Sequence, residues 1–408
     1  MIQIRKIIQP TYNISQQEIR HSNTRMVLNM IRDMAPISRV DLARNCSLSV
    51  STVSNLVDGL IRDEWVVEKE SVAISARGRH AVMLEVNEQR GFVATVELLS
   101  RGYICTIYDI KLHKICGQRI KDTIYNAEHI ARTITGMLVA NKISIEKLLS
   151  IHLIFPGIVD QVSGDLISSA AFPDIANLDR HVVIRLREMF PQALVLVSTN
   201  GTIIALEEFV INKTSPTLPL LSLNIDEAIF GGVVMSNPDS NMNFCFPVEI
   251  GHSIIDYNGE ECYCGNRGCL ETLCSTPKLF KMLNERAGMK LEYSDLFGSD
   301  CNVDAMKTVA KELENKNEEV IKVLKDYTQV LCKGLISNIN LLGIQSVRIG
   351  GDIAFLGETY LEMIKTTFNE LCSPLINKGR IKFELFLSDY EQIRLAATLM
   401  CLDIVFNK

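Results

Sequence analysis

The chain has 408 residues, of which 47% are hydrophobic and 22% are charged, and its formal net charge is −6. A chain of this length predicts two or three domains, each able to bury its own core. The composition excludes a disordered chain, a collagen and a coiled-coil rod. The apolar stretches are too short for a membrane helix, and the polar first 15 residues lack the apolar core of a signal peptide, so we expect a cytoplasmic protein without membrane insertion.

Charge is spread almost evenly along the chain. Residues 1–88 hold 11 lysines and arginines against 10 aspartates and glutamates, and the remaining residues hold 31 against 38. This balance argues against a generally basic protein that coats nucleic acid, but it leaves open DNA binding by one face. In the cytoplasm most of the 12 cysteines are expected to be reduced thiols, and only a close group of them needs a chemical explanation.

Three short helices are predicted near the N-terminus. Apolar residues at helical spacing predict a helix over 23–34, and Ser38 and Ser49 are favourable N-caps for helices over 39–45 and 50–62. The third helix has an apolar stripe of Val50, Val53, Val57 and Leu60 and a polar face of Ser51, Thr52, Asn55 and Asp58. A slim polar face is what the second helix of a helix-turn-helix needs to enter the major groove.

Two strands are predicted next, over 66–69 and 81–86, joined by a basic loop. Arg77 and Arg79 flank a glycine in this loop, an arrangement that suits a narrow minor groove. The alternative is a helical hairpin that makes dimer contacts, with both arginines simply solvated.

These features together predict a winged helix-turn-helix DNA-binding domain over residues 1–88. The predicted DNA contacts are Ser51, Thr52, Asn55, Arg77 and Arg79.

Strand groups alternate with long helices in the rest of the chain. The predicted strands are 92–96, 103–108, 114–119, 220–225 and 228–235, and the predicted helices are 127–140, 304–316, 318–342, 358–372 and 390–406. This alternation predicts a layered α/β body of two similar lobes with a cleft between them. We assign residues 89–205 and 381–408 to the first lobe and 206–380 to the second. The last helix is apolar on nearly every face and is expected to be buried.

The clearest chemical signal is His252 followed by Cys262, Cys264 and Cys269. Three thiols within eight residues and one imidazole ten residues earlier match the four ligands of a closed tetrahedral Zn²⁺ site. Four protein ligands leave no open coordination position, so the predicted zinc is structural. The alternative is that the cysteines are reduced thiols of a surface loop.

The segment 249–271 reads Glu-Ile-Gly-His and, further on, Cys-Tyr-Cys-Gly-Asn-Arg-Gly-Cys-Leu-Glu. It resembles the signature of the ROK family, which holds bacterial sugar kinases and sugar-responsive repressors. The Phe-Pro-Gly-Ile-Val-Asp run of 155–160 and the Ile-Gly-Gly run of 349–351 extend the similarity. Residues 37–43 and 51–54 resemble the repressor branch, of the xylose, N-acetylglucosamine and glucose repressor type, which carries a winged helix that the kinases lack.

The resemblance implies two actin-like, ribonuclease-H-like lobes with a sugar in the cleft. It maps the residues that hold sugar hydroxyls onto Glu249, His252 and Glu271, and Thr199 and Asn200 complete the predicted effector site. Carboxylates accept several hydroxyl protons, and an imidazole fixed by a metal is a rigid partner. The alternative for each glutamate is a solvated surface charge or a helix cap.

Three departures from the kinase pattern predict a protein that is not an enzyme. The stretch 96–100 lacks the glycines that bring backbone amides to phosphates. Asp226 and Glu227 stand where a second phosphate loop is expected, and their charges repel a polyphosphate. Asn200 replaces the aspartate that acts as base, and Thr199 replaces a sugar-contacting asparagine.

The sequence therefore predicts a DNA-binding regulator of carbohydrate genes, in the form of a repressor whose degenerate kinase body senses a sugar or sugar derivative. We expect a homodimer or tetramer on a pseudo-palindromic, A·T-rich operator. Two alternatives stay open: an ATP-dependent sugar kinase with an appended regulatory domain, and a repressor whose partner is a protein such as a membrane sugar transporter.

Overall fold

The computed structural model describes residues 15–70, 82–99, 102–121, 126–160, 166–168, 181–212, 219–237, 242–294, 300–373, 380–387 and 390–407. The chain divides into two compact units. Unit 1 comprises residues 1–92, 109–113 and 402–408, and unit 2 comprises 93–108 and 114–401. Within the described ranges, none of the helices combines the length and apolar character that a membrane crossing needs. The predicted boundaries at residues 88 and 205 stay predictions, but the assignment of 381–408 to the first lobe is wrong at its start, because residues 382–385 pair with 346–349 in the sheet of the second lobe.

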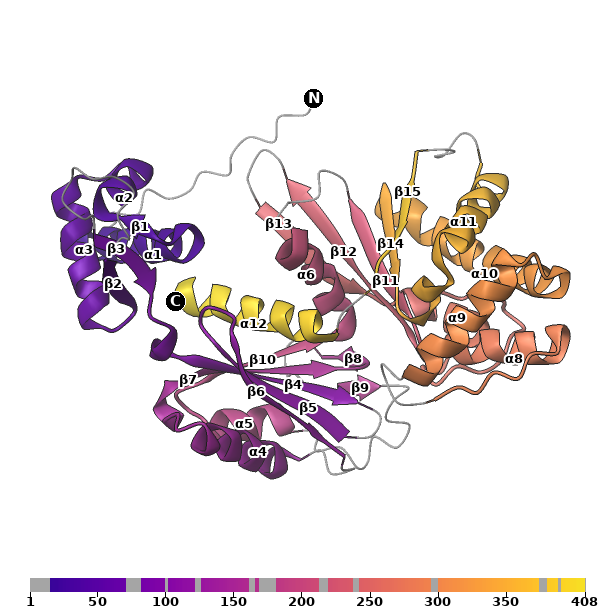
Figure 1. Cartoon of the computed structure of the whole chain (residues 1–408), viewed down its shortest axis with the longest axis horizontal. Coiled ribbons are helices and arrows are strands. Elements are labelled where there is room, and N and C mark those ends of the chain that lie inside the picture. Colours follow the sequence, from indigo (N-terminus) through magenta and orange to yellow (C-terminus); the bar gives the residue numbers. More distant parts are fainter. Residues whose placement is uncertain are drawn as a thin grey trace. The chain divides into compact units, whose positions relative to one another are not determined.

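Unit 1 is built from three helices and a small sheet (Figure 1). Its described elements are helices α1 (Gln16–Met34), α2 (Arg39–Cys46) and α3 (Val50–Arg62), strands β1 (Ile37–Ser38), β2 (Val66–Glu70) and β3 (Val82–Val86), and the 3-10 turn η1 (Glu88–Arg90). The strand order is β1-β3-β2, and β3 pairs antiparallel with both neighbours. The predicted helices and strands of this region are present. The loop with Arg77 and Arg79 lies outside the described residues.

Helix α1 begins seven residues before the predicted start. Ser15 forms a capping box with Glu18, because the serine hydroxyl accepts a hydrogen bond from the Glu18 N–H at 3.1 Å and the glutamate accepts one from the Ser15 N–H at 2.6 Å. A capping box satisfies backbone groups at a helix start and stabilises a polar first turn. Periodicity alone missed this turn because it buries no apolar side chain.

The apolar stripe predicted for α3 is wrong at its first member. Val50 is 48% exposed, whereas Val53, Leu56, Val57 and Leu60 are buried. Val50 is the first residue of the helix, and Cα–Cβ bonds tilt toward the N-terminus of a helix, so this side chain projects beyond the packed turns. The outer face of α3 therefore combines Val50 with the predicted polar residues.

The end of the last helix belongs to the core of unit 1. Phe406 packs edge to face on Trp65, with ring centroids 5.5 Å apart, and the Arg32 guanidinium lies 5.2 Å from the Phe406 ring centroid. Arg32 also forms an ion pair with Asp403 at 2.8 Å. Residues from both ends of the printed sequence thus form one aromatic and charged cluster.

Unit 2 contains two five-stranded sheets with the same strand layout. Most of the remaining elements belong to it, and β4, β5 and α12 each extend into unit 1 at one end. The elements of the first lobe are β4 (Phe92–Leu99), β5 (Gly102–Asp109), β6 (Lys114–Ile120), α4 (Ala127–Ala140), η2 (Ile145–Lys147), β7 (Leu148–Phe155), β8 (Ile158–Val159), β9 (Leu166–Ser168), α5 (Val182–Met189), β10 (Leu194–Thr199) and α12 (Tyr390–Asn407).

The second lobe follows the first in chain order. Its elements are α6 (Asn200–Asn212), β11 (Leu220–Ile225), β12 (Ile229–Asn237), β13 (Met242–Val248), η4 (Ile250–His252), α7 (Leu270–Cys274), α8 (Thr276–Ala287), α9 (Asp300–Glu314), α10 (Glu318–Leu342), β14 (Ser346–Gly350), η5 (Asp352–Leu356), α11 (Gly357–Leu371) and β15 (Lys382–Leu385). The sheet orders are β10-β7-β4-β5-β6 and, read from the other edge, β15-β14-β11-β12-β13, so the five strands of each sheet, counted along the chain, occupy the same places. This repetition confirms the prediction of two similar α/β lobes.

Two local features position the pocket described below. Helix α6 starts directly at the end of β10 and lies against β12, where a Cβ atom on Gly232 would come within 2.2 Å of the Gly201 carbonyl oxygen. Only glycine permits this close approach. Strand β4, predicted over 92–96, continues to Leu99, so the stretch 96–99 that lacks the glycines of a phosphate loop is regular strand.

Helix α12 is buried against the first sheet, as predicted. The Arg394 guanidinium donates to the Glu97 carboxylate of β4 at 2.6 Å, and both side chains are buried. His152 of β7 donates from Nδ1 to the Ala397 carbonyl at 2.9 Å, and its Nε2 lies 2.8 Å from the Ser198 hydroxyl, with which it forms a second hydrogen bond.

Candidate functional site

The N-terminal end of α3 carries a small network of hydroxyl groups. The Ser49 hydroxyl accepts a hydrogen bond from the Thr52 N–H at 3.1 Å and lies 2.9 Å from the Ser51 hydroxyl and 2.8 Å from the Thr52 hydroxyl. This network fixes the first turn of the helix. Val50, Ser51 and Asn55 are exposed beside it, and Thr52 is half-buried.

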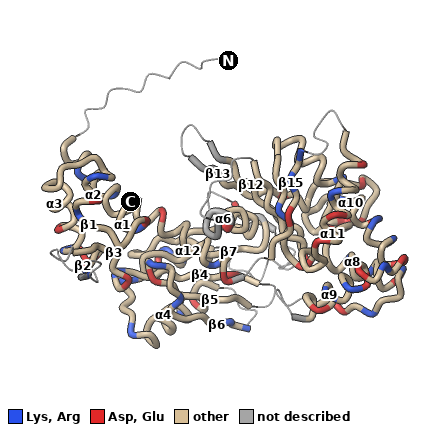
Figure 2. The backbone as a smooth tube through the Cα atoms, turned by 45° about the horizontal axis from the view of Figure 1, so that its top comes forward, with Lys and Arg blue, Asp and Glu red and all other residues tan. Residues whose placement is uncertain are grey.

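Helices α1, α2 and α3 carry charged residues of both signs. The three helices of unit 1 carry six arginines and four acidic residues (Figure 2). Asp58, predicted on the polar face of α3, forms an ion pair with Arg39 at 2.8 Å, and Arg39 also contacts Glu68 of β2. Asp58 therefore connects α3 to α2, while its own side chain remains more than half exposed.

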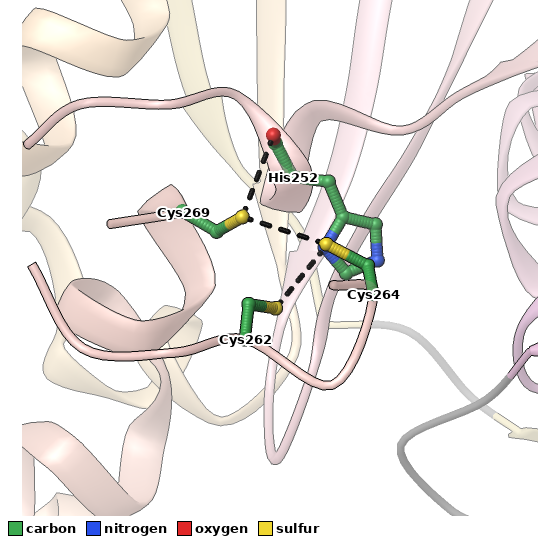
Figure 3. Close-up of side chains that lie close together, drawn as sticks. All are labelled: His252, Cys262, Cys264 and Cys269. Atoms are coloured by element: carbon green, nitrogen blue, oxygen red, sulfur yellow. Dashed lines mark hydrogen bonds between the residues drawn. The ribbon is translucent and has the colours of Figure 1, made fainter. Parts of the chain in front are cut away.

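The four predicted metal ligands lie together in unit 2 (Figure 3). One ligand atom from each of His252, Cys262, Cys264 and Cys269 lies within 4.8 Å of every other. The Cys262 sulfur is 3.6 Å from His252 Nδ1, and the sulfurs of Cys264 and Cys269 are 3.7 Å apart. Around a tetrahedral ion with ordinary Zn–S and Zn–N bonds these separations are about 3.6 and 3.8 Å. The donor set and its spacing fit a metal ion.

The backbone of the loop holds the ligands in this arrangement. Cys262 N–H donates to the Asn266 carbonyl at 2.8 Å, and Gly268 N–H donates to the Glu260 carbonyl at 2.9 Å. Gly268 has a φ of +67°, and a Cβ atom there would lie 1.6 Å from the Asp256 carbonyl oxygen. Glycine is required at this position, because any side chain would displace the loop and with it Cys269.

A pocket in unit 2 collects every residue predicted to bind the effector. It is lined by Thr199, Asn200, Glu227, Glu249, His252, Tyr263 and Glu271, with Leu98, Leu99, Ile229, Phe230 and Val248 among its apolar residues. The two lobes both contribute, through the ends of β4 and β10 and through the loops around the metal ligands. The structure therefore brings the predicted effector residues together beside the metal cluster.

Three carboxylates share this pocket. Glu271 is buried, and its Oε2 accepts a hydrogen bond from the Ile229 N–H at 2.7 Å. The pKa of Glu271 is raised to about 7, chiefly by burial and in smaller part by the carboxylates of Glu249 and Glu227. Burial also raises the pKa of Glu249. The three groups are thus close enough to influence one another.

Tyr263 lines the pocket and was not among the predicted site residues. Its hydroxyl lies 2.9 Å from His252 Nε2, and the two rings pack edge to face with centroids 5.1 Å apart. If His252 uses Nδ1 for a metal, Nε2 carries the proton and donates it to the tyrosine oxygen. The phenolic proton is then directed elsewhere. The signal in the sequence was the position of Tyr263 between two predicted ligands.

Asn200 and the two acidic residues of the predicted phosphate loop have different environments. Asn200 is buried at the start of α6, and its Oδ1 has no hydrogen-bond partner in the described part of the chain. Glu227 lines the pocket. Asp226 is instead buried beside Asp352, whose N–H donates to Asp226 Oδ1 at 2.6 Å. Burial, with Asp352 and Glu227 nearby, raises the pKa of Asp226 to about 8.

Two lobes with equivalent sheets, a pocket to which both contribute and a separate unit with a helix-turn-helix define an actin-like, two-lobed protein of the sugar-kinase fold class with an attached winged helix. The chain belongs to the ROK family, whose model matches residues 103–382.

Named relatives align along most of the chain. The DNA-binding transcriptional repressor Mlc of Escherichia coli (strain K12) is 23% identical over 362 residues, which cover 88% of this chain and 87% of that protein. The xylose repressor of Caldicellulosiruptor bescii is 25% identical over 369 residues, covering 86% and 88%.

Two solved structures of the ROK family differ in how much of this chain they cover. A ROK family transcriptional regulator, described as a homologue of the E. coli MLC protein, superposes with a TM-score of 0.71 and 18% identity, covering 95% of this chain and 97% of its own. A ROK family glucokinase from Streptomyces griseus in complex with glucose and AMPPNP superposes with a TM-score of 0.53 and 16% identity, covering 76% of this chain and 99% of its own. The kinase fold thus accounts for about three quarters of this chain.

Proposed function

We propose that the chain is a DNA-binding transcriptional repressor of carbohydrate genes, whose unit 2 senses a sugar or sugar derivative. The observation that carries this proposal is a helix-turn-helix unit in the same chain as a ROK body. Repressor relatives align over more than 80% of both chains, whereas the glucokinase leaves about a quarter of this chain unmatched. We place the repressor in the cytoplasm, where it reaches its operator.

DNA binding is assigned to the exposed start of α3. Ser51, Thr52 and Asn55 present hydroxyl and amide groups to base edges, and Arg77 and Arg79 of the wing enter the minor groove. The exposure of Val50 adds an apolar group that suits a thymine methyl. One such unit reads only a few base pairs, so we propose a homodimer or a tetramer on a pseudo-palindromic, A·T-rich operator.

Unit 2 is proposed to bind its sugar without phosphorylating it. Asn200 cannot act as the general base, and the end of β4 is a regular strand without the glycines of a phosphate loop. Glu227 adds a negative charge to the pocket. The alternative, an ATP-dependent sugar kinase with an appended regulatory unit, needs both a base and a phosphate loop, and it is favoured by no contact described above.

The metal cluster is proposed to hold one structural Zn²⁺ through His252 Nδ1 and the sulfurs of Cys262, Cys264 and Cys269. When bound, the ion would fix the loop between these residues by four coordinate bonds. Glu249 and Glu271 lie on either side of that loop in the sequence, so an ordered loop keeps both carboxylates at the pocket. Metal analysis of untagged protein should find one zinc per chain. If the untagged protein contains no zinc and Cys262→Ser is as stable as the wild type, this assignment is contradicted.

The effector is proposed to contact Glu249, His252, Glu271, Thr199 and Asn200. A ligand that prefers one arrangement of the two lobes shifts the population toward that arrangement, and by linkage it changes the affinity for DNA. The size of the change is limited by the difference in ligand affinity between the arrangements.

The test combines three measurements on the full chain. Operators are selected from random duplexes, their affinity is measured by fluorescence anisotropy with and without sugars, and ATP consumption is followed with the same sugars. We expect specific duplex binding that a sugar alters, without ATP turnover. Turnover at ordinary enzyme rates would support the kinase alternative, and absence of any specific duplex would overturn the repressor. Alanine at both Arg77 and Arg79 should reduce the salt dependence by roughly two charges per chain at most.

A further inference from the structure

A groove lies between α1 and α3 in unit 1. It is lined by Gln16, Ile19, Arg20 and Asn23 of α1 and by Thr52, Asn55, Leu56, Asp58 and Arg62 of α3. The four residues of α1 are spaced by one face of a helix, which the start of α1 turns toward α3. The groove therefore runs beside Thr52 and Asn55, two of the residues proposed to read bases.

The α1 side of the groove belongs to a part of the helix that the core does not hold. Residues 15–22 are all exposed, and the first buried residue of α1 is Val27. The capping box of Ser15 and Glu18 stabilises this helical start without apolar burial. The first two turns of α1 thus add surface beside α3 and little packing.

Two arginines of the groove have no acidic partner. Arg20 and Arg62 are both exposed, and neither forms an ion pair with a residue that the structure describes. Asp58, the acidic member of the described lining, is already paired with Arg39 at 2.8 Å. Arg20 and Arg62 therefore leave two positive charges available to a ligand.

The other polar side chains of the groove are also donors. The amides of Gln16, Asn23 and Asn55 each carry an NH₂ group. Arginine, glutamine and asparagine are among the side chains that bind the phosphate and sugar oxygens of DNA. Ile19, which is 48% exposed, adds an apolar surface that suits a deoxyribose. The groove thus has the chemistry of a site for a sugar-phosphate backbone.

The dimensions of DNA place a backbone at this groove when α3 reads bases. The major groove is about 12 Å wide and a helix with its side chains is about 10–12 Å across, so a helix that enters it lies between the two backbones. Packed helices have axes about 8–10 Å apart. Because α1 packs on α3, its exposed start faces one of these backbones.

We propose that the groove between α1 and α3 receives the sugar-phosphate backbone of one operator strand, with Arg20 and Arg62 each contacting a phosphate. The inference rests on the proposed function, in that unit 1 binds operator DNA. It adds α1 to the DNA-binding surface and assigns it to phosphates. Arg20 and Arg62 are positioning residues that hold α3 in the major groove, and base specificity stays with α3 and the wing.

The test is the salt dependence of operator binding by the full chain, measured by fluorescence anisotropy. Arg20→Ala and Arg62→Ala should each lower the slope of log affinity against log salt by about 0.9 per bound chain, since one phosphate contact is lost. The affinity ratio of wild type to variant should then shrink about threefold per chain between about 50 and about 200 mM salt. A base substitution in the operator should cost the same in these variants as in the wild type.

Three further variants serve as controls. Arg20→Lys keeps the charge and should keep the salt slope. Arg132→Ala removes an exposed arginine of α4 in unit 2 and should leave the slope unchanged. Asn55→Ala should instead alter the cost of a base substitution, because it removes a base contact. Urea unfolding of Arg20→Ala and Arg62→Ala should match the wild type, since both side chains are exposed.

A second measurement locates the contact. Single phosphates of the operator are replaced, one at a time, by neutral methylphosphonates. The phosphate whose replacement weakens the wild type but not Arg20→Ala is the partner of Arg20, and the four affinities form a double-mutant cycle. We expect that phosphate beside the bases that α3 contacts.

The outcomes separate this proposal from the repressor itself. Wild-type salt slopes in both alanine variants, with operator binding intact, overturn the backbone proposal and leave the repressor in place. Absence of any specific duplex for the wild type overturns the repressor and this proposal with it. If the alanine variants change the oligomeric state in sedimentation and keep the salt slope, the groove joins two copies of the chain and the backbone proposal is wrong.

Discussion

The two lobes of unit 2 share a strand order but accommodate buried charge in opposite ways. In the first lobe Glu97 is paired with Arg394, and His152 has a hydrogen-bond partner for each ring nitrogen. In the second lobe Asp226 lies beside another acid, Asp352, and its Oδ2 has no partner in the described part of the chain. Repeated architecture therefore does not imply repeated electrostatics. The first lobe uses its buried polar groups to hold α12, and the second keeps like charges close to the pocket.

The largest expected effect comes from breaking the ion pair of the first lobe. Glu97→Ala leaves the Arg394 guanidinium buried without its partner, which should lower the free energy of unfolding by about 3–5 kcal/mol. Urea unfolding measures this change. The double variant with Arg394→Met should recover much of the loss, since the uncompensated charge is then absent. A loss below 1 kcal/mol in the single variant would contradict a buried pair.

The acidic pair of the second lobe should respond to pH in a defined direction. The folded pKa of Asp226 is raised to about 8 from 3.8, so between these values the folded state holds a proton that the unfolded state releases. Stability therefore rises as pH falls from 8 toward 4, with a slope of at most about 1.4 kcal/mol per pH unit. Urea unfolding at several pH values gives the slope. Asp226→Asn, which resembles the protonated acid, should flatten it, and an unchanged slope would exclude Asp226 as its source.

His152 should act in the opposite direction. Burial lowers its pKa to about 4 from 6.5, because the charged ring is excluded from water. Between pH 6.5 and 4 the unfolded state binds the proton more tightly, so this residue lowers the stability by about 2 kcal/mol at pH 5 relative to pH 8. His152→Gln can keep a donor and an acceptor while removing the titration. Comparison of its pH profile of stability with that of Asp226→Asn separates the contributions of the two lobes. If His152→Gln loses as much stability between pH 6.5 and 4 as the wild type does, His152 is not the source of that loss.

The smallest effect concerns a single methyl group in unit 1. Replacing one thymine of the selected operator by deoxyuridine should weaken binding by about 0.8 kcal/mol where Val50 contacts that methyl, and Val50→Ala should remove this difference. Anisotropy with both proteins and both duplexes forms a double-mutant cycle. Asn55→Ala serves as the control, since it should weaken both duplexes equally. A full methyl effect in Val50→Ala would show that another residue makes the contact.

Local signals allowed much of the fold to be predicted. Helices α3 and α10 have their predicted bounds because Ser49 and Asn317 cap their starts, and a left-handed glycine follows the end of α10. Ser15, by contrast, starts α1 through a capping box that hydrophobic periodicity does not register. Several strands, among them β1, β7 and β15, were absent from the prediction because their partners are distant in sequence.

The candidate site was predicted in part. Ligand spacing identified the metal cluster, since short-range chemistry dictates it. Spacing could not show that Tyr263 contacts His252. It also could not show that Asp226 is buried beside Asp352 whereas Glu227 lines the pocket, because the positions of neighbouring side chains at a strand end depend on which backbone N–H groups are available to them. Val50 was wrongly predicted to belong to the apolar stripe of α3, because periodicity does not show where the helix stops packing against its neighbours.

The shared helix α12 has a consequence for the order of synthesis. Asp403 pairs with Arg32, a residue made 371 positions earlier, and Phe406 covers Trp65 in the same cluster. On the ribosome the contacts of Asp403 and Phe406 with Arg32 and Trp65 can therefore form only after nearly the whole of unit 2 has been translated, and contacts of such long sequence separation form late. A nascent or shortened chain that lacks residues 402–407 carries an incomplete DNA-binding unit. Under the proposed function, we expect a chain that lacks these residues to bind operator DNA less tightly than the full chain.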